Sequence, residues 1–311
     1  MEASSRLSTF AKFAWFTLGY NILVILWGVF LRASKSGDGC GQHWLTCHGE
    51  VIPSAPELKT IIEFSHRLTT GPAFLLVLIL VILAFRRFEK GHPIRKMAVL
   101  SFVFIITEVL VGAGLVLTGN TAETLTAARP FWAVGHLINT FALLAFLTLT
   151  AWHAEGARKH FFNRSPKAVA LLGIGAIAIL LVGTSGSVAA LGSMLFPSAT
   201  LAEGIAQDFS AASNILIRLR LSHPILSILT SVYLLFVAGW LRTTAAGAAS
   251  VTRWSNILSI VILIQLAFGT ATLLTLAPIV MQVGHLLLAD ILWISFVLLA
   301  ANFLSRQSDD A

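Results

Sequence analysis

Eight long apolar runs limit what this chain can fold into. They lie near residues 10–31, 61–85, 96–117, 131–153, 168–190, 216–241, 254–275 and 280–304. Each is long enough to cross the hydrocarbon core of a bilayer as a helix, which takes about 20 mostly apolar residues. Because 57% of the residues are hydrophobic and only 11% are charged, a water-soluble domain could not cover this apolar surface. We therefore predict an all-α polytopic membrane protein with eight transmembrane helices.

The positive charges predict how these helices are oriented. Two thirds of the 21 lysine and arginine residues lie in the N-terminal tail, in loops 86–96, 154–167 and 242–253, and at Arg306. The positive-inside rule places such segments in the cytoplasm, so we expect both termini there and loop 32–60 outside. The first run is too long for a cleaved signal and is treated as an anchor. Short loops favour a bacterial cell inner membrane. The net charge of +7 is explained by the basic cytoplasmic segments, so we expect no nucleic-acid partner.

The two cysteines, Cys40 and Cys47, both lie in the first outward loop. An outward loop faces an oxidising compartment, so we expect a disulfide between them, and a redox-active pair is compatible with that reading. The same loop contains His43 and His48, and two cysteines with two histidines could instead bind zinc or copper.

The chain also carries an internal repeat. A shift of 157 positions aligns "EFSHRL" with "RLSHPI" and "TEVLVGAGLVLT" with "IQLAFGTATLLT", and a shift of 149 aligns the two copies of "VGHL". Apolar segments can resemble each other by chance, but the histidines in these copies argue against chance. An even number of runs separates the copies, so the halves are parallel. We predict two tandem pseudo-symmetric four-helix bundles, residues 1–155 and 156–311.

Four of the nine histidines stand near the outer ends of the even-numbered runs. They are His66, His136, His223 and His285. A single intramembrane histidine more often joins two helices, but four at matching depth favour a functional role. Paired imidazoles from facing helices are how helix bundles hold a haem. We therefore predict axial iron ligation within each half, by His66 with His136 and by His223 with His285, at two haem sites toward the outer side.

The two halves differ beside these histidines. Glu63 lies three residues before His66, whereas Arg220 occupies the matching position in the second half. A carboxylate can transfer protons beside a reacting haem edge, and a guanidinium suits a haem propionate. We therefore assign the chemistry to the first half and a structural or electron-relaying haem to the second. The alternatives are that Glu63 pairs with Arg67 and that Arg220 anchors to lipid headgroups.

A further carboxyl group, Glu108, lies near the middle of the third run, where the second copy has Gln265. An ionised carboxylate costs several kcal/mol at this depth. We expect Glu108 to be protonated and hydrogen-bonded between helices, with a role in proton transfer as the alternative.

Together these motifs resemble the haem A synthase family over about residues 10–304. The resemblance is carried by the cysteine loop, by E-x-x-H-R at the start of the second run, by "GH" in the fourth and eighth, and by histidine in the sixth. It implies an enzyme that oxidises the C8 methyl group of haem O to a formyl group, giving haem A for terminal respiratory oxidases.

The resemblance also implies roles for single residues. Glu63 matches the family's catalytic carboxylate, and Cys40 and Cys47 match its loop cysteines. In the family, the substrate haem O is held in the first half, where His66 and His136 match its ligands. The haem b of the family is held in the second half, where His223 and His285 match its ligands. The expected partners are haem O, haem A, haem O synthase and an electron donor.

Three other functions fit parts of this pattern. A dihaem b-type cytochrome that carries charge across about 30 Å of hydrocarbon would need haems toward opposite faces, whereas all four histidines lie on one side. A b-type cytochrome in quinol-linked electron transfer at the outer face stays an open alternative. A haem carrier, built like a repeat-containing transporter, would leave the side groups of the haem unchanged. An oxidase assembly factor without catalysis would not need Glu63.

Overall fold

The computed structural model describes residues 7–156 and 165–306, and these residues are almost entirely helical. Within them, eight helical spans are long and apolar enough to cross a membrane, as predicted. Seven are single helices: α1 (Thr9–Ala33), α2 (Leu58–Arg87), α3 (Pro93–Leu117), α4 (Arg129–Ala154), α5 (Pro166–Leu195), α9 (Ala249–Leu274) and α10 (Ile279–Leu304).

The sixth span, Ile215–Thr244, is composite. It consists of α7 (Ile215–Arg218), the short 3₁₀ helix η1 (Leu219–Leu221) and α8 (Ser222–Thr244). A further short helix, α6 (Leu201–Phe209), lies in the connection that follows α5. An isolated bridge between Cys47 and Glu50 is the one extended pairing among the described residues.

Local sequence explains where several helices begin. The hydroxyl of Ser8 accepts from the backbone N–H of Ala11 at 3.1 Å and caps α1, and Ser165 caps α5 in the same way. Pro93 stands in the first turn of α3, where its missing N–H costs nothing because the first N–H groups of a helix have no partner within it.

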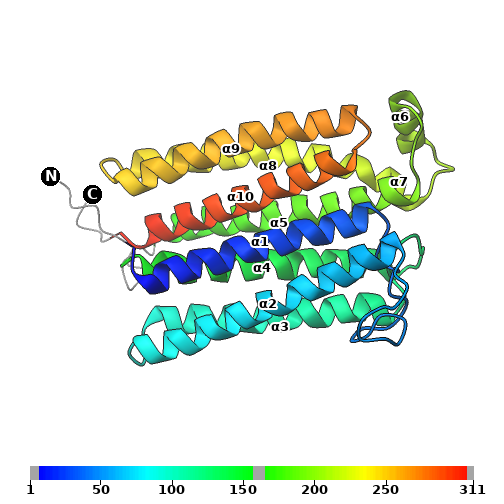
Figure 1. Cartoon of the computed structure of the whole chain (residues 1–311). Coiled ribbons are helices and arrows are strands. Elements are labelled where there is room, and N and C mark those ends of the chain that lie inside the picture. Colours follow the sequence, from blue (N-terminus) through cyan, green and yellow to red (C-terminus); the bar gives the residue numbers. More distant parts are fainter. Residues whose placement is uncertain (1–6, 157–164, 307–311) are drawn as a thin grey trace.

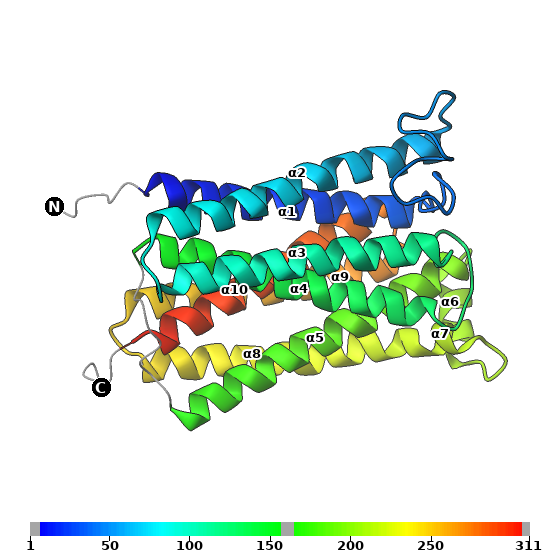
Figure 2. The same ribbon diagram turned by 90° about the horizontal axis from the view of Figure 1, so that it is seen from below.

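The helices pack as two adjoining rings (Figures 1 and 2). In the first, α2 and α4 each pack against α1 and α3, so they face each other across the ring. In the second, α8 packs against α5 and α9, and α10 packs against α9 and more weakly against α5. Contacts of α4 with α5 and of α10 with α1 and α4 join the rings. The pseudo-symmetry of the two halves stays a prediction.

The centre of the core lies where α4 meets α10. There the indole Nε1 of Trp293 donates to the backbone carbonyl of Phe141 at 2.7 Å, and the two rings stack with centroids 5.6 Å apart. The outer faces expose apolar side chains such as Leu23 and Val232, as lipid-facing helices do.

The two ends of the molecule differ in their loops (Figure 1). One end has the start of α1, the end of α10 and the short α2–α3 and α8–α9 connections; the other has the cysteine loop, residues 34–57, together with α6 and α7. Of the basic segments used to predict orientation, Arg6 and residues 157–164 lie outside the described residues. The orientation in the membrane stays a prediction.

Candidate haem sites at the end with the cysteine loop

The structure brings His223 of α8 and His285 of α10 together. Their ring centroids lie 6.2 Å apart, with the ring planes at 89°. Metal–imidazole nitrogen distances of about 2 Å, as in zinc sites, place two opposed nitrogens about 4 Å apart and the two ring centres about 6 Å apart. The spacing of this pair therefore fits one iron held between two imidazoles.

The rings of His66, His223 and His285 are pressed against glycines of neighbouring helices. A Cβ at Gly186 would lie 2.8 Å from Cε1 of His223, and a Cβ at Gly269 would lie 2.8 Å from Cε1 of His285. In the first half a Cβ at Gly28 would lie 3.1 Å from Cε1 of His66. Because glycine has no side chain, these positions leave space for the imidazole rings. Gly28 and Gly186 lie in the segments "WGVFLRASKSG" and "SGSVAALGS", which resemble each other.

The first-half pair, His66 and His136, stands on α2 and α4, which face each other across the first ring. The Nδ1 atoms of His66, His136 and His285 are buried and lack a hydrogen-bond partner. Buried imidazole nitrogens are usually hydrogen-bonded, so these three Nδ1 atoms are exceptions within the described residues. Both predicted pairs stand on helices that face each other across a ring, and the rings of the second pair are in contact; the meeting of the first pair stays a prediction.

The Nδ1 atom of His223 is held in place by α5. It lies 3.2 Å from the backbone carbonyl of Val182 and 3.2 Å from the hydroxyl of Ser185. Metal-bound histidines commonly donate their second ring N–H to such an acceptor. This leaves Nε2 of His223 free for iron.

Glu63 is buried beneath the cysteine loop, with 3% of its side chain exposed. Its Oε2 accepts from the backbone N–H of Cys40 at 2.8 Å, and its Oε1 forms an ion pair with Arg67. The predicted alternative that Glu63 pairs with Arg67 is therefore confirmed. The carboxylate does not extend toward the membrane surface, because protein encloses it.

Arg67 also forms hydrogen bonds with the cysteine loop. Its Nη1 donates to the backbone carbonyls of three loop residues, His43 at 2.5 Å, Trp44 at 3.1 Å and Thr46 at 3.0 Å. Glu63 and Arg67 thus form a clamp that holds the loop on α2. The sequence offered the Glu63–Arg67 pair as an alternative, in keeping with their i, i+4 spacing, but it did not predict that Arg67 also holds the cysteine loop.

Cys40 and Cys47 form the predicted disulfide, so their sulfurs are not free to bind zinc or copper. The imidazole Nε2 of His48 lies 2.9 Å from the carbonyl of Gly39. Among the described residues, no three histidine, cysteine or acidic side chains cluster in a way that could hold a metal ion.

Arg220 has a partner within the chain that was not predicted. Its Nη2 lies 2.7 Å from Oδ1 of Asp208 in α6, its Nε donates to the same oxygen at 2.8 Å, and both side chains are largely buried. A haem propionate would therefore share this guanidinium with Asp208.

Glu108 is hydrogen-bonded between helices, as predicted. Its Oε2 accepts from the side-chain amide of Asn139 and its Oε1 from the hydroxyl of Thr140, each at 2.5 Å. The same Oε1 lies 3.4 Å from Nδ1 of His136. Sequence reasoning placed Glu108 at a helix contact but did not foresee that the contact includes a candidate iron ligand.

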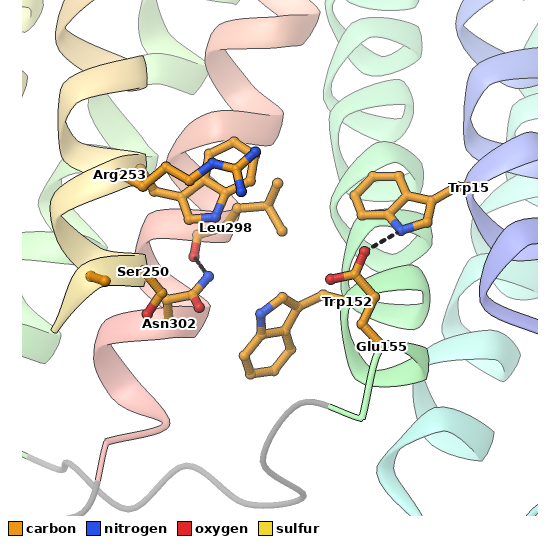
Figure 3. Close-up of a pocket in the computed structure, with 9 residues that line it drawn as sticks. Trp15, Trp152, Glu155, Ser250, Arg253, Leu298 and Asn302 are labelled. Carbon is orange, nitrogen blue, oxygen red and sulfur yellow. Dashed lines mark hydrogen bonds between the residues drawn. The ribbon is translucent and has the colours of Figure 1, made fainter. Parts of the chain in front are cut away.

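Two cavities lie at different depths. A cavity of about 560 Å³ at the end of the molecule away from the histidines is lined by Trp15, Trp152 and Trp254, and there the indole of Trp15 donates to Glu155 at 2.7 Å (Figure 3). A cavity of about 300 Å³ lies between α3 and α4 and is lined by Val111, Ala128, Phe131, Trp132 and Gly135. Of these two cavities, the smaller one includes the residue that precedes His136.

Comparison with known proteins identifies the family. Residues 11–297 match the family COX15-CtaA, described as cytochrome oxidase assembly protein. The chain is 44% identical over 300 residues to "Protoheme IX farnesyltransferase" of two strains of Thermus thermophilus, which covers 96% of this chain and 49% of those proteins. It therefore spans about half the length of these relatives. It is 29% identical over 282 residues to "Heme A synthase" of Shouchella clausii, covering 88% of this chain and 89% of that protein. The chain belongs to the COX15-CtaA family of cytochrome oxidase assembly proteins.

Proposed function

We propose that this protein is a haem A synthase, which oxidises the C8 methyl group of haem O to a formyl group. The observation that carries the proposal is the difference between two otherwise similar histidine pairs. Glu63 is buried on the helix that bears His66, whereas Arg220 in the second half is paired with Asp208. The relatives named "Heme A synthase" support the same activity.

The proposed sites follow the division into residues 1–155 and 156–311. Haem O binds in the first half between His66 and His136, and a resident haem b binds in the second half between His223 and His285. The 6.2 Å separation of the second pair supports this assignment. When bound, haem b supplies one-electron chemistry, and Arg220 is placed to share its charge with a propionate.

Glu63 is the proposed proton acceptor. Oxidation of the methyl group proceeds through a hydroxymethyl stage, and a carboxylate beside that group can take up and pass on the protons exchanged in each step. Glu63 receives hydrogen bonds from the Cys40 amide and from Arg67. Its position therefore connects the proposed reaction site directly to the disulfide loop.

The proposed partners are an electron donor and a haem O synthase. The Thermus relatives carry the name of a protohaem farnesyltransferase, and the match covers 49% of their length. Farnesyl transfer to protohaem is the class of reaction that supplies haem O, which supports a partnership between the two activities. We place the protein in the cell inner membrane with both termini in the cytoplasm and the haem sites toward the outer side.

The proposal is tested by the haems that the protein retains. The chain is expressed beside a source of haem O, purified, and its haems are extracted and separated by chromatography. The unchanged protein should yield haem b and haem A. Glu63→Gln keeps an acceptor for the Cys40 amide but removes the base, so it should yield haem b with haem O or its partly oxidised form.

Histidine variants test the division between the halves. His223→Ala and His285→Ala should lose haem b, and His66→Ala should lose the substrate haem while keeping haem b. The opposite pattern would reverse the two assignments. If the unchanged protein returned haem O unaltered, it would be a haem carrier or an assembly factor and not an oxidising enzyme.

A further inference from the structure

We propose that Glu108 positions His136 as an iron ligand, by accepting a hydrogen bond from its Nδ1, and that this makes the first-half haem more electron-rich than the second-half haem. The inference rests on the proposed function only in taking His136 as a haem ligand. It assigns to Glu108 a role at the ligand itself, in addition to the contact between α3 and α4.

The carboxylate of Glu108 is fixed by groups from α4, the helix that carries His136. Thr140, one turn after His136, donates to Oε1, and Asn139 donates to Oε2, each at 2.5 Å. Asn139 is itself held, because its amide also donates to the carbonyl of Phe104 at 2.9 Å and its Oδ1 accepts from Thr107 at 2.5 Å. This network keeps Oε1 facing the imidazole.

The remaining gap between Glu108 and His136 is small. Nδ1 of His136 lies 3.4 Å from Oε1, slightly beyond the about 2.7–3.2 Å of a formed N–H···O hydrogen bond, and this Nδ1 is buried with no other partner. If His136 held the iron through Nε2, a modest rotation of its ring would close the gap. Contacts of this kind often tighten only in the loaded site.

The second half has a neutral group at the matching place. The 157-position shift that aligns the halves pairs Glu108 with Gln265. The side-chain nitrogen of Gln265 donates to the backbone carbonyl of His285 at 3.2 Å and lies 3.5 Å from its Nε2, while its Oε1 is buried without a partner. The aligned helix position thus lies beside the last histidine in both halves, but the carboxylate of Glu108 faces Nδ1 of His136 whereas the amide of Gln265 faces Nε2 of His285.

This difference has a predictable effect on the iron. A carboxylate that accepts the second N–H of a ligating imidazole raises the basicity of the ligand. A more basic ligand stabilises the oxidised iron, and hydrogen bonding around the ligands is one of the means by which proteins set haem potentials. The other ligand of the second half, His223, donates to the neutral carbonyl of Val182, so the carboxylate distinguishes the first half.

The test is the removal or withdrawal of the carboxylate in the full chain loaded with haem. Glu108→Gln should raise the reduction potential of the first-half haem and leave that of the second-half haem unchanged. Glu108→Asp keeps the carboxyl group but draws it back from the imidazole, so it should raise the first-half potential by a smaller amount. Potentials are read by optical redox titration, and the ligand field of each ferric haem by electron paramagnetic resonance. Loss of such a second partner lowers metal affinity roughly 10- to 100-fold, so retention of first-half haem by Glu108→Gln should fall on dilution.

Each outcome decides the inference. A Glu108→Gln protein that keeps its first-half haem with unchanged potential and resonance overturns it, and the proposed function would stand. Should Glu108→Gln fail to fold, Glu108→Asp decides alone: a raised first-half potential supports the inference and an unchanged one overturns it. If the unchanged protein carries no haem in its first half, the site assignment fails instead, and with it the proposed function.

Discussion

Replacing Arg67 by alanine should release the cysteine loop from α2. The substitution removes the ion pair to Glu63 and the donors to three loop carbonyls. Removing one partner of a buried ion pair costs about 3–5 kcal/mol because the other charge is left uncompensated. Glu63 keeps the Cys40 amide as a donor and Arg67 is 20% exposed, so we take the lower end of about 3 kcal/mol.

The expected change is a faster opening of the loop. Since 1.4 kcal/mol corresponds to about a factor of ten, the open population should rise roughly a hundredfold. The assay measures how fast a phosphine reductant reduces the disulfide in the folded protein, because buried groups react through local opening. Alkylation and mass spectrometry then quantify the freed thiols of Cys40 and Cys47.

Lys59→Ala provides the matched control at the same end of the molecule. Lys59 pairs with Asp38 at 3.8 Å, and both side chains are half-exposed. Exposed pairs contribute about 0–1 kcal/mol, so this variant should change the reduction rate by less than about fivefold. If Arg67→Ala reduced no faster than Lys59→Ala, the clamp would not hold the loop and the reasoning would be wrong.

Three further predictions concern other parts of the chain. Gly186→Ala should lower the haem b content because its Cβ would contact the ring of His223, whereas Gly173→Ala on the same helix has open space and should not; absorbance of the purified variants compares them. Trp293→Phe should lose the hydrogen bond between α10 and α4, costing about 1 kcal/mol, seen as a lower midpoint of thermal unfolding. The exposed Glu123 carboxyl has its pKa lowered by the hydrogen bond from Lys35, so its small contribution to stability is present above the ordinary carboxyl pKa and lost as the pH falls through the lowered value. Lys35→Ala should return that pKa toward its ordinary value in an NMR titration, and an unchanged pKa would contradict this cause.

The clamp suggests why an acidic residue at position 63 and a disulfide loop occur together. The amide of Cys40 and the carboxylate of Glu63 are in direct contact, so a change in the loop alters the surroundings of the proposed proton acceptor. We expect reduction of the disulfide to slow the formation of haem A in the unchanged protein. Product analysis before and after reduction measures this, and equal rates would separate the loop from the chemistry.

Much of the fold could be predicted from the sequence because a bilayer imposes a length on every span. Each apolar run had to be helical to satisfy its backbone hydrogen bonds in lipid, and all eight predicted runs are found with their ends shifted by a few residues. The disulfide was also predictable, because both cysteines lie within one outward loop. The repeat also predicted which histidines pair; the contact of His223 with His285 agrees with it, and ligation by either pair stays a prediction.

Only the tertiary structure decided which polar side chains meet. The contacts of Glu63 with Cys40, of Arg220 with Asp208 and of Glu108 with His136 join residues from different elements. They depend on how each helix is rotated about its axis. The sequence of a membrane helix hardly records that rotation, because the face toward lipid is as apolar as the face toward the core. The sequence could therefore determine which residues reach the same depth, and only packing could determine which of them are in contact.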